Sequence, residues 1–138
     1  SNPWVSLFAS RSNFVFTGGK EQEDYIFKNK APAAGEPAAY VPEYSPKGYD
    51  NYADITLTSN LTGTGFVLII DGSDVPANEA AARLLLQGRL PSEIETRLKK
   101  GELKTFEVLL RGHHNHAESN DQLNIVTYRV PPKTALSN

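Results

Sequence analysis

One stretch constrains the fold of this chain more than any other, because it joins an unbroken apolar run to a polar turn and a helical pattern. Phe66 to Ile70 is apolar throughout, which is typical of a strand buried on both faces. Residues 71–74 (DGSD) favour turns and helix caps. Up to Gln87, apolar residues recur at helical spacing, so we predict a strand, a tight turn and a helix. The apolar helical positions are Ala77, Ala80, Ala81, Leu84 and Leu85.

A second helix and two further strands are predicted downstream. Pro91-Ser92 opens the helix, with Ser92 and Glu95 matching a capping box, and Gly101 stands where a helix ends. Residues 105–110 are expected to close a β-α-α-β crossover, parallel to the 66–70 strand and right-handed. Residues 123–130 alternate and would form the last strand, antiparallel to its predecessor.

The N-terminal part reads as a short anchor followed by strands. Residues 4–8 place Trp4 and Phe8 one helical turn apart, so they are expected to pack onto the body. Aromatic residues alternate with smaller or polar neighbours in 14–16 and 25–27, which indicates a β-hairpin. Residues 53–57 alternate between apolar and polar and predict a half-exposed strand.

Residues 31–52 differ in composition from the rest of the chain. They hold four prolines and four of the six tyrosines, so we expect neither helix nor central strand but an extended, partly polyproline II arm. The arm would be pinned along the domain surface by tyrosine rings; the alternative is an aromatic groove or a peptide-like contact surface. Residues 131–138 have the composition of a loose tail.

These elements predict a single α/β domain over residues 1–138. Its sheet would be mixed, with about six strands, residues 66–70 at the centre, a β-α-α-β crossover and an N-terminal β-hairpin. A chain of 138 residues is long enough to bury a hydrophobic core without disulfides or structural metal ions.

Composition excludes several classes of function. The chain has no cysteine, which excludes disulfides, thiolate metal sites and cysteine nucleophiles. A formal charge of −2 without a basic stripe argues against nucleic-acid binding through this domain. The apolar runs are far shorter than the ~20 residues of a membrane helix, so no membrane insertion of this segment is expected. A leader or anchor upstream of Ser1 is left open.

The first candidate site is the turn at the end of the apolar strand, where open α/β sheets bind ligands. Its two aspartates disfavour a phosphate and could cap the helix, or hold a hard cation such as Mg²⁺ or Ca²⁺. A tyrosine of the arm could act as a lid. The predicted ligand-binding residues are Asp71, Gly72, Ser73, Asp74, Asn78, Tyr44 and Tyr49.

The second candidate site is a histidine cluster. His113, His114 and His116 lie within four residues and, with Glu118 or Asp121, could share a transition metal. The alternative is a solvated loop between strands. No catalytic residues are predicted, since no nucleophile motif is present and a Ser73–His–Asp71 set would rest on guessed distances.

Several phrases of the chain occur together in an uncharacterised bacterial family. They are NPWVSLF, GEPAAY, YADITLTSNLTGTGFVLIIDG, ANEAAARLL and TFEVLLRG. The chain resembles the C-terminal, membrane-external region of regulatory proteins, some with a winged-helix domain and one membrane span. The resemblance implies a sensory or interaction domain in the periplasm, whereas the residues alone leave a cytoplasmic location open.

We therefore expect a non-catalytic domain that binds a small molecule or a protein partner, with no cofactor. The alternative is a metal-binding module or metal-dependent hydrolase that uses the loop from His113 to His116. The sequence leaves a homodimer open.

Overall fold

The computed structural model describes residues 3–18, 25–117 and 122–132, with Trp4 described by its backbone alone. The predicted packing of the Trp4 side chain and the tail from residue 133 onward lie outside the described residues. The elements are α1 (Pro3–Phe8), η1 (Ala9–Arg11), β1 (Phe14–Thr17), β2 (Ile26–Asn29), β3 (Ala39–Tyr40), β4 (Tyr44–Ser45), β5 (Gly48–Ser59), β6 (Phe66–Gly72), α2 (Val75–Leu86), α3 (Ser92–Lys99), β7 (Phe106–Asn115) and β8 (Leu123–Arg129).

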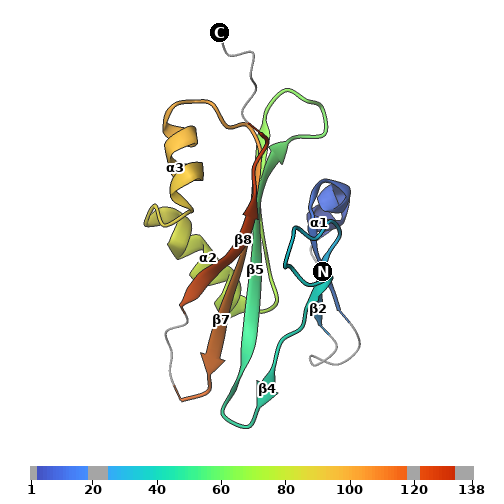
Figure 1. Ribbon diagram of the computed structural model, residues 1–138, viewed down its shortest axis with the longest axis vertical. Helices are drawn as coiled ribbons and strands as arrows, with labels where there is room; N and C mark the ends of the chain where they lie inside the picture. The colour runs from blue at the N-terminus through green and yellow to red at the C-terminus, as the bar shows by residue number, and fades with distance from the viewer. Residues whose placement is uncertain (1–2, 19–24, 118–121, 133–138) are drawn as a thin grey trace.

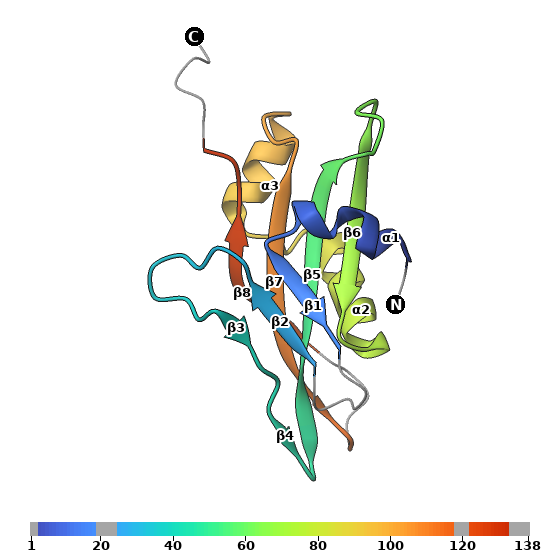
Figure 2. The same ribbon diagram turned by 90° about the vertical axis from the view of Figure 1, so that its right-hand side faces the viewer.

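The elements form layers around a long central strand, β5. Helices α2 and α3 cover one face of the larger sheet, and α1 with the smaller sheet lies on the other face (Figure 1). The smaller sheet has the order β1-β2-β3, and the larger sheet has the order β4-β5-β7-β8 with β6 also paired to β5 (Figure 2). Every pairing in both sheets is antiparallel.

The prediction of one mixed sheet of about six strands is wrong, since the strands divide into antiparallel sheets of three and five. The N-terminal hairpin is confirmed by β1 and β2, and the antiparallel last strand by β7 and β8. Strands β6 and β7 both run antiparallel to β5 and therefore point the same way, but β5 lies between them. The helices α2 and α3 thus connect two strands that are not neighbours.

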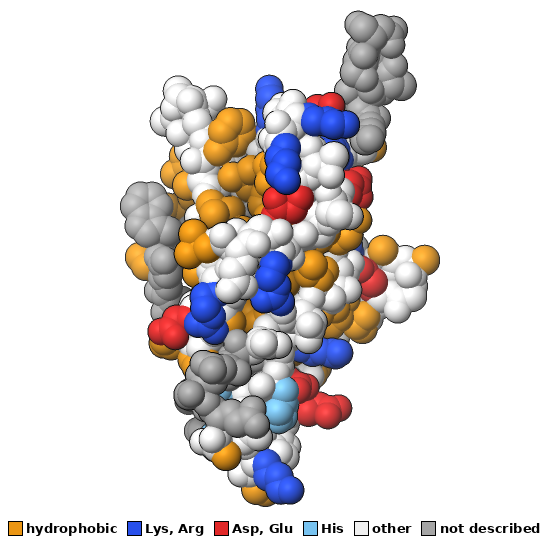
Figure 3. Space-filling model, turned by 90° about the vertical axis from the view of Figure 1, so that its left-hand side faces the viewer, with side chains coloured by type: hydrophobic (Ala, Val, Ile, Leu, Met, Phe, Trp, Pro, Cys, Tyr) orange, Lys and Arg blue, Asp and Glu red, His pale blue; other side chains and the backbone are white. Residues whose placement is uncertain are grey.

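The prediction that residues 66–70 form the central, fully buried strand is also wrong. Within the described residues β6 pairs only with β5, so it is an edge strand, and Phe66 and Leu68 are 56% and 50% exposed. Figure 3 views the helical side and shows hydrophobic side chains gathered at its upper left, the side on which β6 lies.

The central strand is β5, which the sequence had indicated as half-exposed. Ala53 and Ile55 on one face are fully buried against the helices, while Asp54 and Thr56 on the other face are each only 3% exposed. The polar face is buried because the smaller sheet covers it. Strand β5 begins at Gly48, inside the proline-rich segment in which no central strand was expected.

The helices follow the sequence pattern closely. Helix α2 begins after Asp74, whose carboxylate accepts a hydrogen bond from the Ala77 N–H, and its predicted alanines are buried. Both Gly88 and Gly101 adopt positive φ, 64° and 68°, after the two helices, a conformation that glycine adopts without strain. The predicted capping box is not formed: the N-cap of α3 is Pro91, and no side chain caps this helix by a hydrogen bond.

An aromatic core joins the two sheets. Phe27 of β2 is fully buried, and its ring lies 5.9 Å from that of Tyr52 on β5. Tyr52 and Leu109 supply the floor of this core from the larger sheet, and Phe14, Phe27 and Tyr40 cover it from the smaller one. Burial of these apolar groups is what holds the two sheets together.

We expect Phe27→Ala to lower the free energy of unfolding by about 3–5 kcal/mol, because it removes a fully buried ring and leaves a cavity. The matched change Phe66→Ala removes a ring that is 56% exposed and should cost at most about 1 kcal/mol. Urea denaturation measures both. Equal costs would show that the smaller sheet does not pack on the larger one in solution.

Candidate functional site

The polar residues of the predicted turn site bind one another. The Tyr49 hydroxyl donates to Asp74 Oδ2 at 2.5 Å, and the Ala77 N–H donates to Asp74 Oδ1 at 2.8 Å. Ser73 Oγ accepts from the Tyr52 N–H at 3.0 Å. Asn78 Oδ1 accepts from the Gly72 N–H at 2.8 Å, which closes the turn onto the helix. These contacts fix the geometry between β6 and α2.

Tyr49 links the two candidate sites that the sequence had kept apart. Its ring stacks on Tyr44 with centroids 5.7 Å apart and lies 5.1 Å from His114 and 5.9 Å from His116. This arises because Tyr49 and His114 are directly opposite on β5 and β7. Tyr44 and Tyr49 thus lie together, as a ring stack beside the histidines.

Strand β7 continues to Asn115, so His113 and His114 lie on a strand and not in the solvated loop given as the alternative. Adjacent strand residues point to opposite faces, which separates His113 from His114. His113 Nδ1 lies 3.1 Å from Asp50 Oδ1, while the His114 and His116 rings are 5.7 Å apart. Within the described part of the chain no group of three histidine, cysteine or acidic side chains is placed to hold a metal. The other two predicted partners, Glu118 and Asp121, lie outside the described residues, so metal binding stays a prediction.

A cavity of about 210 Å³ lies where α1, η1 and β1 meet strands β5 and β6. Its wall is mainly apolar, and it brings in one residue of the predicted turn site, Asp71. Acidic and hydroxyl side chains from β5 and β6 add polar groups to it. The lining consists of Val5, Ser6, Phe8, Ala9, Ser12, Phe14, Val15, Phe16, Asp54, Thr56, Ile69 and Asp71.

Two carboxyl groups meet in this cavity. Asp54 on β5 and Asp71 on β6 are directly opposite in the strand register, and both line the cavity. Asp54 Oδ2 accepts a hydrogen bond from Thr56 Oγ1 at 2.9 Å. The other oxygen of Asp54, Oδ1, is buried and accepts no hydrogen bond from any described donor. Burial of both groups raises the pKa of Asp71 and, with the neighbouring Glu107, holds the pKa of Asp54 well above its ordinary value.

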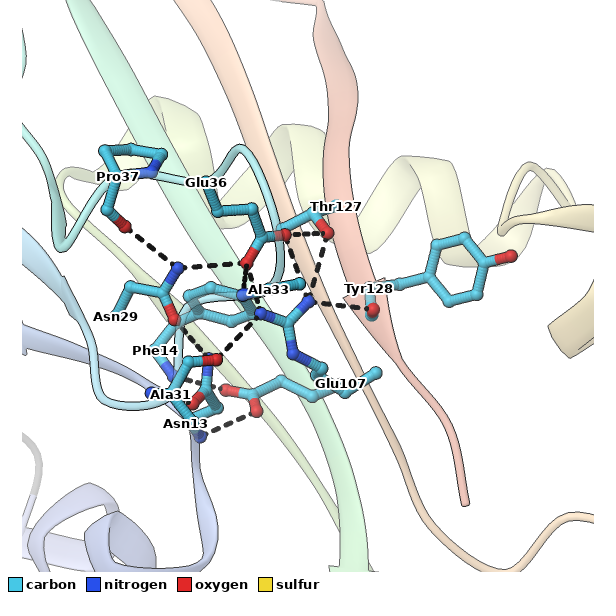
Figure 4. A network of polar contacts seen from close by, with 11 residues as sticks. Asn13, Phe14, Asn29, Ala31, Ala33, Glu36, Pro37, Glu107, Thr127 and Tyr128 are labelled. Carbon is cyan, nitrogen blue, oxygen red and sulfur yellow. Dashed lines mark hydrogen bonds and ion pairs between the residues drawn. The ribbon is translucent and has the colours of Figure 1, made fainter. Parts of the chain in front are cut away.

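Glu107 of β7 ties the N-terminal segment to the larger sheet. Its two carboxylate oxygens accept hydrogen bonds from the Asn13 N–H at 2.7 Å and the Phe14 N–H at 2.9 Å (Figure 4). Glu107 is directly opposite Thr56, on the face that carries Asp54. Its charge and a hydrogen bond between the two carboxyls add to burial in raising the pKa of Asp54. The clamp on β1 and the protonation of Asp54 are therefore coupled.

A second polar network closes the same interface from the side of β8. Glu36 pairs with Arg129 and accepts hydrogen bonds from Thr127 Oγ1 at 2.6 Å and the Ala33 N–H at 3.0 Å (Figure 4). The hydrogen bonds from Arg129 hold the pKa of Glu36 well below its usual range. The Arg129 guanidinium also lies 5.1 Å from the Phe14 ring centroid. This network fastens the proline-rich segment to the larger sheet.

Sequence reasoning missed Asp54 and Glu107 as site residues, since polar residues on alternate positions of a strand suggest a solvent face. A signal was present for Glu107, which stands between apolar residues in the run TFEVLL. No corresponding local signal marks Asp54, because the covering sheet comes from residues far away in sequence.

The comparisons with known proteins identified no relative of this chain. No family model matches the chain, and neither a curated protein nor a solved structure was found to be similar to it. The family resemblance drawn from sequence phrases stays a prediction.

We expect Asp54→Asn to change how stability depends on pH. The folded state binds the Asp54 proton more tightly than the unfolded chain does, so this group makes the wild type lose stability as pH rises above about 3.9. Asparagine has no such proton, so the stability of the variant relative to wild type should rise as the pH increases above about 3.9. Urea denaturation at several pH values measures the difference in stability, and Glu79→Gln, at an exposed position of α2, is the control. A constant difference across those pH values would contradict a raised pKa.

Glu36→Gln should show the opposite sign. The lowered pKa of Glu36 means that its stabilisation is present above about 4.3, the ordinary value, and is lost as pH falls. We expect the variant to cost about 1–3 kcal/mol near neutral pH, since it breaks a charged hydrogen-bond pair, and less in acid. Thermal unfolding at neutral and acidic pH measures the difference. A cost that persists unchanged in acid would argue against the ion pair.

Proposed function

We propose that this protein is a non-catalytic ligand-binding domain, and that its small-molecule ligand occupies the cavity between α1, β1 and strands β5 and β6. The observation that carries the proposal is the cavity itself, with its apolar wall and the paired carboxyls of Asp54 and Asp71. Concave, mainly apolar sites with a few convergent polar groups are where proteins bind small molecules. Groups with shifted pKa values concentrate at such sites.

The size of the cavity sets the size of the ligand. At about 210 Å³ it is smaller than the roughly 300–1,000 Å³ of pockets for drug-sized molecules. It is larger than an apolar cavity of about 150 Å³ that holds benzene. One ring or a short alkyl chain with a polar head would fill it. A wider depression of about 710 Å³ beside His113 is open to solvent and lined mainly by polar side chains, which suits such a ligand less well.

The position of the cavity supports a role in sensing. Its wall is shared between the larger sheet and the segment formed by α1, η1 and β1, and Glu107 fastens that segment next to the cavity. A ligand that contacts both parts stabilises their packing by its binding free energy. Occupancy would then be read out as a tighter or looser N-terminal segment, as expected for the membrane-external sensor that the sequence phrases resemble.

The periplasmic location, the homodimer and the alternative of a metal-dependent hydrolase remain predictions from the sequence. Among the described residues no helix is long and apolar enough to cross a membrane.

A fragment screen tests the proposal. We expect fragments of one ring or a short chain to shift the NMR signals of α1, β1 and β6. Ile69→Phe, which adds atoms to a side chain that lines the cavity, should abolish binding. The matched control is Leu68→Phe, at the preceding residue of β6, whose side chain faces the other way and is 50% exposed. This change should leave binding intact.

Fragments that bind Ile69→Phe as well as they bind the wild type would contradict the cavity as the ligand site. Shifts confined to the residues around His113 would move the site to the wider depression instead.

A further inference from the structure

We propose that the cavity takes a small organic cation, a primary ammonium group carried on one ring or a short alkyl chain. The inference rests on the proposed function, because it assigns a chemical class to the ligand of the same cavity. Two features carry it: paired acids, one of which has a buried oxygen that accepts no hydrogen bond from a described donor and faces a second acid, Glu107, and an aromatic wall that receives the apolar part.

The paired acids present hydrogen-bond acceptors, and one of these oxygen atoms accepts no hydrogen bond from a described donor. Asp54 and Asp71 stand opposite each other on adjacent strands, and Asp54 Oδ1 accepts no hydrogen bond from a described residue although it is buried. A buried acceptor left without a donor is costly, so a ligand that donates there is favoured. An ammonium group carries three donors and a positive charge, and it can therefore serve both carboxyls at once.

No described lysine, arginine or histidine is paired with Asp54 or Asp71, although the guanidiniums of Arg11 and Arg129 lie 5.5 Å and 5.1 Å from the ring centroids of the lining residues Phe8 and Phe14. The described lining residues include no lysine, arginine or histidine. Nearby, Arg11 of η1 donates to the Ser59 carbonyl, Lys30 donates to the Ala9 carbonyl, and Arg129 is paired with Glu36. Glu107 adds a further acid on the face that carries Asp54. The field inside the cavity thus favours a cation and disfavours an anionic ligand.

The wall argues for an organic cation and against a metal ion. Phe8, Phe14 and Phe16 line the cavity together with Val5 and Ile69. Aromatic faces attract ammonium groups and pack against an alkyl or ring body. A hard metal ion would need about six oxygen ligands, and this wall is largely apolar.

Binding of an ammonium group should release protons. Without a ligand, burial and Glu107 favour the protonated form of Asp54, and burial raises the pKa of Asp71. A positive charge beside them favours the ionised form. Up to about one proton should leave for each ligand bound at any pH at which part of these groups is protonated.

The test compares three probes of similar shape: benzylamine, benzyl alcohol and toluene. Isothermal titration calorimetry is run at slightly acidic pH, in two buffers that differ in ionisation enthalpy and contain no primary amine. We expect benzylamine to bind at least about tenfold more tightly than benzyl alcohol, because only the amine supplies a charge to the paired acids. Proton release should accompany benzylamine alone.

Matched variants test whether the probes bind at the paired acids. Asp71→Asn and Asp54→Asn should each weaken benzylamine by about tenfold or more and leave toluene nearly unchanged. Glu79→Gln, an exposed change on α2, should leave all three probes unchanged. Asp71→Asn tests the inference independently if Asp54→Asn fails to fold.

The outcomes separate the two proposals. If the alcohol or toluene binds as tightly as the amine and Ile69→Phe abolishes that binding, the cavity is a ligand site but the cation inference is overturned. If benzylamine binds equally well to the aspartate variants, the inference is also overturned. If no probe binds, both proposals fail.

Discussion

The structure depends on the burial of strand β5 on both faces. One face is apolar and packs against the helices, as an ordinary α/β layer requires. The opposite face carries Asp54 and Thr56, and it can be buried only if another layer both covers it and provides partners for its polar groups. The smaller sheet covers this face through the aromatic core. Glu107 and Glu36 make the polar contacts that fix the position of the smaller sheet on the larger one.

The two glutamates therefore have a structural task that the paired aspartates do not share. Glu36 is surrounded by donors from three segments, and Glu107 accepts two backbone N–H groups. Asp54 lies among the same strands but accepts only from Thr56 among the described donors. A buried acceptor left without a donor lowers the stability of the folded state. Such local conflicts are expected at functional sites rather than in plain cores.

Local signals predicted the elements well and their arrangement poorly. The helix α2, its cap by an aspartate of the turn and the glycine after α3 follow from short-range chemistry, and they are where the sequence placed them. The apolar run of β6 suggested a central strand, yet it is an edge strand whose Ile69 faces the cavity and whose Ile70 packs toward the helices. An edge strand that carries apolar residues on both faces has the sequence pattern of a central strand. Conversely, β5 looked half-exposed because the segments that cover it are distant in sequence.

The same long-range packing explains why the candidate site was only half visible. Asp71 was named from the turn that follows β6, but the rest of that turn is engaged in joining the strand to α2. Its partner Asp54 comes from another strand, and the wall comes from α1, η1 and β1, which the aromatic core and the contact of Glu107 with the start of β1 hold against the larger sheet. The cavity thus exists as long as the two layers stay docked. A ligand inside it and the clamp beside it act on the same interface, so occupancy and docking are thermodynamically linked, and each strengthens the other.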